Sequence, residues 1–252
     1  MTVKVRFLLH IFLASTISFS TIGYSFAQDT VLNKYGLWVI KNEKTFNATI
    51  QSQADKQMAD IKKIISNIVI DLRYATANNF MKRKLYAATT TTYLRYAAAK
   101  ALQQVQSALN KEKFGLKIFD AYRPYSVTEK MWEPIKDERY VANPKNGSGH
   151  NRGIAVDVTL INLLTKEELP MGTGFDNFSD TAHHSFTALP TQIISNRDLL
   201  KNSMEKFGFK ALETEWWHYS LPNASNYELL DLSFKKLKNI TASGRKRSIS
   251  YH

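Results

Sequence analysis

Residues 148–157 read SGHNRGIAVD, and no other stretch says more about how the chain is arranged. Its two glycines allow a sharp change of direction, after which the apolar residues 154–161 predict a β-strand that contains Asp157. His150 and Asp157 are seven positions apart, so on one straight strand their side chains would face opposite sides. We therefore expect the turn between them to redirect the chain and to bring both side chains to one site.

A second segment, residues 215–218, reads EWWH and begins 58 positions after Asp157. Together the two segments offer His150, Asp157 and His218 as ligands for one divalent ion, with Glu215 left over. Because the chain has no cysteine, any metal must be held by His, Asp or Glu. Catalytic zinc sites use three protein ligands and leave one position to water. The set therefore predicts one Zn²⁺ per chain, with Glu215 as the proton carrier.

Each part of this pattern has an ordinary alternative. A single His in a strand is usually packed or exposed, an Asp near Gly is usually a turn residue, and a pair such as Trp216-Trp217 is usually core. Only their joint occurrence, on segments that can lie side by side, favours a metal site. His183 and His184 are adjacent on an extended stretch and point apart, so we expect loop residues there that gate the site.

The order of the predicted elements is mixed. Apolar periodicity predicts helices at 52–66, 92–111, 127–135 and 196–207, and strands at 68–72, 116–122, 154–161, 209–212 and 217–221. Glycine and proline interrupt residues 170–190, which we expect to form a long surface loop. Because strands and helices do not alternate regularly, the sequence predicts an α+β fold. Its central sheet would be mostly antiparallel, with helices packed beside it and the zinc site at the sheet edge.

The first 27 residues predict an export signal. Lys4 and Arg6 precede an apolar stretch that ends in Ser25-Phe26-Ala27, where small residues suit cleavage before Gln28. An uncleaved membrane anchor is the alternative, since the stretch is about long enough to span a bilayer. Its many Ser and Thr residues favour cleavage. We expect an exported protein, periplasmic or secreted, with no stable membrane anchor, and the lack of cysteine suits an oxidising compartment.

The rest of the chain shows no repeats and no internal linker. We expect a loosely structured N-terminal segment at 28–50, one domain at 51–234, and a basic, frayed tail at 235–252. The formal net charge is +12, and loss of Lys4 and Arg6 with the signal leaves +10. These charges are dispersed outside the tail and are not interleaved with aromatic residues. We therefore expect no nucleic-acid partner, and loose contact with anionic cell-wall polymers.

The motifs resemble those of the zinc D-alanyl-D-alanine dipeptidases, which are related to the D-alanyl-D-alanine carboxypeptidases of cell-wall metabolism. The matching blocks are Ser148-x-His150-x-x-Gly153-x-Ala155-x-Asp157, Glu215-Trp216-Trp217-His218, Asp71-Leu72-Arg73-Tyr74-Ala75-Thr76-x-x-Asn79-Phe80, Asp120-Ala121-Tyr122-Arg123-Pro124 and Met171-Gly172-Thr173-Gly174-Phe175-Asp176. They span residues 65–222 in the order of the family. The Asp71 and Met171 blocks favour the dipeptidase branch.

The resemblance implies roles for the residues of the metal site. His150, Asp157 and His218 would be the zinc ligands of a zinc peptidase domain, and Glu215 the catalytic acid and base. Arg123 would be a second catalytic residue that stabilises the tetrahedral intermediate or anchors the substrate. Independently of the resemblance, a guanidinium beside a metal can hold a developing oxyanion with directed donors.

The resemblance also implies substrate-binding residues and a reaction. Ser148 and Asp176 would bind the substrate, with Asp176 facing its free ammonium group, and Arg73 would contact the substrate or support the site. The expected reaction is hydrolysis of D-Ala-D-Ala to two D-alanines in cell-wall peptide turnover. Two alternatives stay open: a carboxypeptidase that trims peptidoglycan stem peptides, and a non-catalytic binding module that keeps zinc for structure. The presence of Glu215 and Arg123 counts against the binding module.

Overall fold

The computed structural model describes residues 32–50 and 53–249, so the predicted export signal lies outside the described residues. The helices are α1 (Glu43–Ile50), α2 (Ile61–Ile64), α3 (Tyr96–Lys111), α4 (Tyr125–Ile135), α5 (Gly149–Arg152), α6 (Thr191–Lys206) and α7 (Phe234–Ile249). The strands are β1 (Val39–Ile40), β2 (Met58–Asp60), β3 (Val69–Ile70), β4 (Tyr93–Arg95), β5 (Phe114–Asp120), β6 (Ala155–Asn162), β7 (Lys210–Leu212), β8 (Glu215–Ser220) and β9 (Leu229–Leu230). None of the described helices is both long and apolar enough to cross a membrane.

A five-stranded sheet organises the fold, in the order β3-β5-β6-β8-β7. Three of its pairings are antiparallel, and β3 pairs with β5 in parallel. The parallel pair arises because β4 and α3 intervene between β3 and β5 and carry the chain back to the same end of the sheet. The predicted α+β class is therefore confirmed, with a sheet that is mostly antiparallel but mixed.

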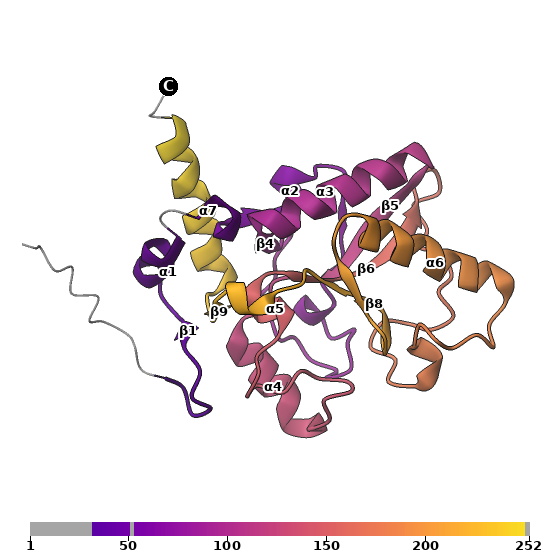
Figure 1. Cartoon of the computed structure of the whole chain (residues 1–252), viewed down its shortest axis with the longest axis horizontal. Coiled ribbons are helices and arrows are strands. Elements are labelled where there is room, and N and C mark those ends of the chain that lie inside the picture. The colour runs from indigo at the N-terminus through magenta and orange to yellow at the C-terminus, as the bar shows by residue number, and fades with distance from the viewer. Residues whose placement is uncertain (1–31, 51–52, 250–252) are drawn as a thin grey trace, which may run out of the picture. The chain divides into compact units, whose positions relative to one another are not determined.

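Helices cover both sides of this sheet. The long helices α3 and α6 lie together against one side, and α4 lies on the opposite side (Figure 1). The inner face of α3 buries Ala98, Leu102, Val105 and Leu109 at helical spacing. Strand β6 is buried along almost its whole length, as expected for a strand covered on both faces. This central strand carries Asp157, so that residue is placed by a strand that is packed on both faces.

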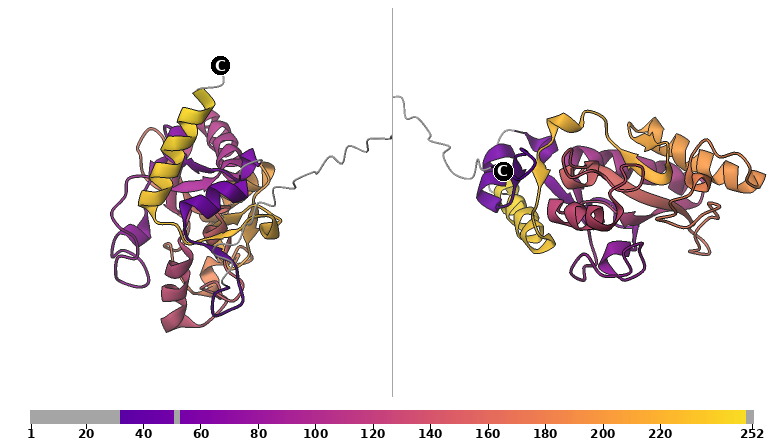
Figure 2. Two further views of the ribbon diagram at one scale, coloured as in Figure 1. Left: turned by 90° about the vertical axis from the view of Figure 1, so that its left-hand side faces the viewer. Right: turned by 90° about the horizontal axis from the view of Figure 1, so that it is seen from below.

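A second core joins the two ends of the described chain. Strand β1 pairs in parallel with β9, and α1 lies beside α7 (Figures 1 and 2). Buried in this cluster are Phe46 and Ile50 of α1 and Leu237 and Ile240 of α7. The expectation of a loosely structured segment at 28–50 was therefore wrong for β1 and α1. The predicted frayed tail at 235–252 was wrong for its first residues, because they belong to α7 and Leu237 and Ile240 are buried in this cluster.

The helix predicted at 52–66 is largely absent. Residues 58–60 form β2, which pairs antiparallel with β4, and only the four-residue helix α2 follows. The Asp60 carboxylate accepts a hydrogen bond from Lys62 N at 3.0 Å and so caps α2. The apolar spacing that indicated one long helix is thus divided between a strand and a single helical turn, because pairing with a distant strand outweighs local propensity.

Candidate metal centre

Three neighbouring strands place a row of polar residues side by side. In the sheet register Asp120 of β5 lies opposite Asp157 of β6, which in turn lies opposite His218 of β8. Directly opposed residues on adjacent strands lie close enough for their side chains to interact. The expectation that β6 and β8 would be neighbours is confirmed. The expected position at the sheet edge was wrong: the row lies on inner strands, where the pairing of β6 with β8 ends.

His150 reaches the same row from a different element. It lies on α5, a single helical turn whose N-cap residue Ser148 forms a capping box with Asn151. Gly153 ends this turn in the left-handed region, with φ of 71°, and sends the chain into β6. The seven-residue spacing from His150 to Asp157 therefore does not place them on opposite faces of one strand, and the expected redirection of the chain is confirmed.

Glu215 is brought to the row by an irregularity in β8. Ala211 of β7 pairs with Tyr219, whereas the next residue, Leu212, pairs with Glu215. Between these two pairs β7 advances by one residue and β8 by four. The extra residues in β8 form a bulge, and a bulge redirects side chains. As a result Glu215 Oε2 lies 3.9 Å from His218 Nδ1, although a spacing of three would place the two on opposite faces of a straight strand.

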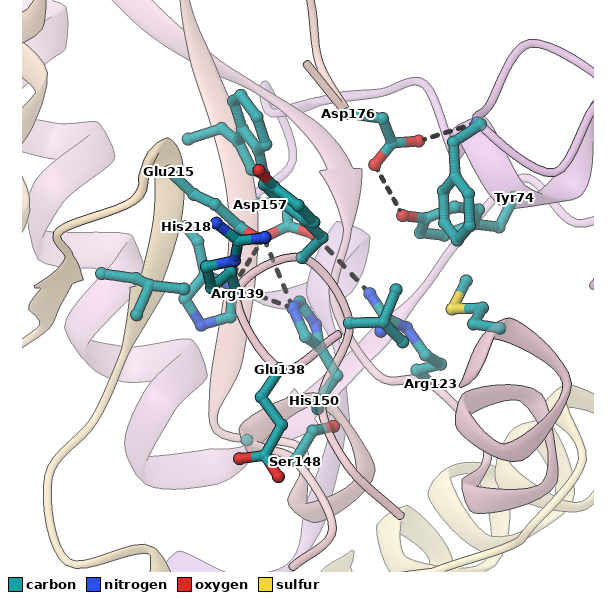
Figure 3. Close-up of a pocket in the computed structure, with 18 residues that line it drawn as sticks. Tyr74, Arg123, Glu138, Arg139, Ser148, His150, Asp157, Asp176, Glu215 and His218 are labelled. Carbon is teal, nitrogen blue, oxygen red and sulfur yellow. Dashed lines mark hydrogen bonds and ion pairs between the residues drawn. The ribbon is translucent and has the colours of Figure 1, made fainter. Parts of the chain in front are cut away.

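The ligand atoms of His150, Asp157 and His218 converge on one point (Figure 3). His218 Nδ1 lies 2.9 Å from Asp157 Oδ1 and 3.2 Å from His150 Nε2, and His150 Nε2 lies 3.4 Å from Asp157 Oδ1. The other ring nitrogen of His150 donates to the Ala121 carbonyl at 2.7 Å. A neutral His150 therefore turns the lone pair of Nε2 toward its neighbours. Lone pairs of two imidazoles and one carboxylate facing one point are a donor set that fits a divalent metal ion.

The acidic groups around this point also favour the binding of a cation. The described residues around it include four carboxyl groups, on Asp120, Asp157, Asp176 and Glu215, and one buried guanidinium, on Arg123. Burial, then the charges of Asp157 and Asp176, raises the pKa of Glu215 to about 8. Burial raises the pKa of Asp157 as well, but the two imidazoles outweigh it and hold that pKa below its usual range. A divalent ion would offset part of this excess of acidic groups.

Arg123 is held by Asp120, a residue for which we predicted no role. Its Nε and Nη2 lie 2.9 and 2.8 Å from Asp120 Oδ2, and Nη2 is 3.9 Å from Asp157 Oδ2. Asp120 is fully buried and also accepts a hydrogen bond from the Tyr86 hydroxyl at 2.8 Å. Its position three residues before Arg123, at the end of a strand, was the signal that could have identified it as a partner of the guanidinium.

A cavity of about 200 Å³ connects these groups. Seven of the eight predicted site residues line it, namely Arg123, Ser148, His150, Asp157, Asp176, Glu215 and His218. Arg73 is not among the lining residues. It forms ion pairs with Asp71 at 3.0 Å and Glu168 at 3.5 Å and lies over the Phe119 ring at 4.4 Å. These contacts match the supporting role predicted for Arg73 rather than contact with a ligand in this cavity. His183 and His184 do not line it either.

Asp176 lies at another side of the cavity, together with Tyr74 (Figure 3). Its carboxylate accepts hydrogen bonds from the Tyr74 hydroxyl at 2.8 Å and from Phe80 N at 3.2 Å. Burial raises the pKa of Asp176 to about 7, although both hydrogen bonds oppose this shift. We predicted no role for Tyr74, but its place in the Asp71–Phe80 block was a usable signal. The cavity thus has a metal-binding side and a separate acidic side.

A polar cavity with a His-Asp-His donor set and a nearby unligated Glu is typical of metal-dependent hydrolases. The chain belongs to the peptidase M15 family described as D-ala-D-ala dipeptidase, whose sequence profile matches residues 54–238. It is therefore a metallopeptidase.

Relatives of the same kind match most of the domain. The D-alanyl-D-alanine dipeptidase of Escherichia coli (strain K12) is 34% identical over 178 residues, which cover 69% of this chain and 89% of that protein. The D-alanyl-D-alanine dipeptidase of Enterococcus faecium is 30% identical, covering 64% of this chain and 89% of its own length. The D-alanyl-D-alanine dipeptidase of Streptomyces coelicolor is 32% identical, and the match covers 65% of this chain and 90% of that protein. The matched lengths show that these relatives are similar across nearly their whole length.

Proposed function

We propose that this chain is a zinc-dependent dipeptidase that hydrolyses D-Ala-D-Ala to two D-alanines in cell-wall peptide turnover. The observation that carries the proposal is one cavity in which a three-residue donor set, an unligated Glu215 and the buried Arg123 lie on one side and Asp176 on another. The family match and the names of the relatives support the substrate.

The donor set supports Zn²⁺ as the metal. Two imidazole nitrogens and one carboxylate oxygen, all within 4.8 Å of one another, form a borderline mixture that Zn²⁺ accepts. When bound, Zn²⁺ supplies a Lewis acid that polarises the scissile carbonyl and lowers the pKa of a water molecule. His150, Asp157 and His218 would hold it, and the Ala121 carbonyl fixes the orientation of the His150 ring.

Glu215 carries the proton in this proposal. It takes a proton from the attacking water and passes it to the amine of the leaving D-alanine. Burial raises the pKa of Glu215 to about 8 in the metal-free protein. A divalent ion beside it would lower this pKa toward the working pH, which suits a group that must both accept and return a proton. Arg123 holds the developing oxyanion, and Asp120 keeps its guanidinium facing the donor set.

Two further residues contact the dipeptide. Asp176 binds the free ammonium group, because its carboxylate faces the cavity and pairs with no cation of its own there. Ser148 contacts the substrate from the opposite wall, next to His150, where its hydroxyl accepts from Asn151 N at 3.1 Å and keeps its own hydrogen to donate. A carboxylate that binds a free amine favours a dipeptidase, because in a longer stem peptide the corresponding nitrogen belongs to a peptide bond and carries no charge.

We also propose that the protein is exported and acts in the periplasm or outside the cell, on the basis of residues 1–27 alone. Such a location suits recycling of released dipeptide, and a net charge of +10 would allow loose contact with anionic wall polymers. Protein recovered from outside the cytoplasm should begin at Gln28, as read by mass spectrometry. Recovery of the full chain in the membrane fraction would instead support an uncleaved anchor.

One assay tests the proposed reaction. The purified protein is incubated with D-Ala-D-Ala, with N-acetyl-D-Ala-D-Ala and with a stem tripeptide ending in D-Ala-D-Ala, before and after treatment with a chelator. We expect release of D-alanine from the free dipeptide alone, lost on chelation and restored by Zn²⁺. Faster cleavage of the tripeptide would support the carboxypeptidase. Zinc binding without cleavage of any of the three would support the binding module.

A further inference from the structure

The loop of residues 170–183 carries Asp176, and its shape depends on contacts with other parts of the chain. Within it the structure has only one short 3₁₀ turn, at Asp180–Ala182. Asp176 itself has φ of 61°, a left-handed conformation that Asp adopts more readily than most other non-glycine residues. A contact with α6 holds the loop on either side of this residue.

Arg197 of α6 provides that contact. Its Nε donates to the Met171 carbonyl at 2.8 Å, its Nη2 to the Thr181 carbonyl at 2.8 Å and its Nη1 to the His183 carbonyl at 3.1 Å. Met171 precedes Asp176 by five residues, and Thr181 follows it by five. One guanidinium thus binds the loop on both sides of the acidic residue, using the planar fork of donors that only Arg offers.

The position of Arg197 is unusual for a cation. The side chain is only 5% exposed, and its hydrogen-bond acceptors in the described chain are all main-chain carbonyls. Burial lowers the pKa of this guanidinium. A buried cation held only by carbonyl dipoles costs free energy relative to an apolar residue of similar size. General stability is therefore a poor reason for an Arg here, whereas fixing the path of a loop requires its three directed donors.

Two neighbouring contacts show the same docking of the loop on α6. Asn196 Nδ2 donates to the Pro170 carbonyl at 2.8 Å. Gly172, with φ of 83°, packs so closely that a Cβ there would lie 3.1 Å from side-chain atoms of Leu189 and Ile193. The start of the loop therefore lies close against the start of α6, with little space for a side chain between them.

We propose that Arg197 is a positioning residue for substrate recognition: it fixes the loop of residues 170–183 so that Asp176 faces the cavity and receives the ammonium group of the dipeptide. This inference rests on the proposed function. The hydrogen bonds from Tyr74 and Phe80 orient the Asp176 carboxylate, and Arg197 holds the backbone that carries it. Without the guanidinium the loop can relax, and the carboxylate is no longer held where a substrate amine would meet it.

The test measures binding of the amine separately from the rest of the reaction. Arg197→Lys keeps the charge but loses the planar fork, and Asn196→Ala removes one bond on one side of Asp176. For each enzyme the KM and kcat for D-Ala-D-Ala are measured, together with the inhibition constant of N-acetyl-D-Ala-D-Ala, which has no ammonium group. For Arg197→Lys we expect KM to rise about tenfold, kcat to change less, and the inhibition constant to stay within about twofold. In Asn196→Ala the ratio of KM to the inhibition constant should also rise, but by less than in Arg197→Lys.

A matched control separates positioning from loss of stability. Met204 lies fully buried on the same helix, in the main core, so Met204→Ala should lower thermal stability and leave the ratio of KM to the inhibition constant unchanged. Both constants are independent of the fraction of active enzyme. If the ratio of KM to the inhibition constant is unchanged in Arg197→Lys, the inference is overturned and the proposed function is not. If Arg197→Lys does not fold, an unchanged ratio in Asn196→Ala has the same meaning. A wild-type enzyme that does not cleave D-Ala-D-Ala would overturn the proposed function instead.

Discussion

At one side of the cavity Asp120, Asp157 and His218 lie in a row on three paired strands, whereas at another side Asp176 lies on a long loop. The strand residues are placed by backbone pairing and by a core packed on both faces of β6. The loop residue is placed by a few side-chain hydrogen bonds from Tyr74 and α6. Under the proposed function, rigid pairing would suit groups that share one metal ion, and the separately anchored acid would select the substrate.

If the strand row holds the metal, breaking it should have the largest effect. In His218→Ala one imidazole of the donor set is lost, so we expect the bound zinc to fall well below one per chain. The rate should drop by about 1,000-fold or more, because several kcal/mol of charge stabilisation disappear with the ion. Metal content by atomic emission and the rate with D-Ala-D-Ala measure both effects. Full zinc content in this variant would contradict the assignment of the row.

Glu215→Gln should separate chemistry from metal binding within the same region. The amide keeps the size of the side chain but cannot carry the proton, so kcat should fall by about 10²–10⁴-fold. Zinc content should stay at one per chain, in contrast to His218→Ala. Retention of more than a tenth of the wild-type kcat would show that another group carries the proton.

Asp176→Asn should affect the loop side of the cavity, and more weakly. The amide tolerates the left-handed backbone of this position, so the loop can keep its course. Loss of the charge should raise KM for D-Ala-D-Ala about tenfold or more, with a smaller change in kcat. Steady-state kinetics measure this split. A fall in kcat with unchanged KM would place Asp176 in the chemical step instead.

Asp176→Asn should weaken substrate binding but increase the stability of the folded protein at neutral and higher pH. Burial raises the folded-state pKa of Asp176 to about 7 from an ordinary value of 3.8, so its contribution to stability is present at low pH and is lost as the pH rises toward 7. Asn does not ionise. In the metal-free protein, the melting temperature of Asp176→Asn relative to wild type should therefore increase between pH 5 and pH 8. A difference that stays constant over this range would contradict the pKa shift.

The smallest effect is expected at His184, which directly follows the loop of residues 170–183. Burial, then the charge of Lys201, lowers its folded-state pKa to about 4. Protonation therefore favours the unfolded chain, and stability should fall as the pH drops below about 6.5, the ordinary value for His. The effect is about 1 kcal/mol, because the side chain is partly exposed. The loss of melting temperature between pH 7 and pH 5 should be smaller in His184→Gln than in wild type.

Sequence patterns predicted the elements that carry their own local signal. Strand β6 and the end of helix α3 were predicted close to their observed bounds, because unbroken apolar residues and helical spacing are visible within a short window. The first residues of the helix predicted at 92–111 were wrong, because residues 93–95 form β4 and pair with β2. Helix α6 begins five residues before the predicted position, at Thr191 after Pro190, a start that the proline could have indicated. In contrast β2, with only three residues, exists because of its pairing with β4, and no local pattern reveals such a partner.

The candidate site divides in the same way. Residues in dense motifs, such as His150 and His218, could be singled out because their side chains have few ordinary uses in that spacing. Asp120 was not singled out, although its position three residues before Arg123 was a usable signal, because an acid at a strand end is common and its contact with the distant Tyr86 is not visible in the sequence. The bulge that turns Glu215 toward His218 depends on the pairing of β7 with β8 and was not predictable from either strand alone.

The parallel pairing of β1 with β9 has a consequence for how the molecule is made. Val39 lies beside Leu229, so the second core cannot close until almost the entire domain has left the ribosome. Contacts between such distant residues form late, after a large loss of chain entropy. A newly synthesised chain therefore completes this second core only when its last helix is available.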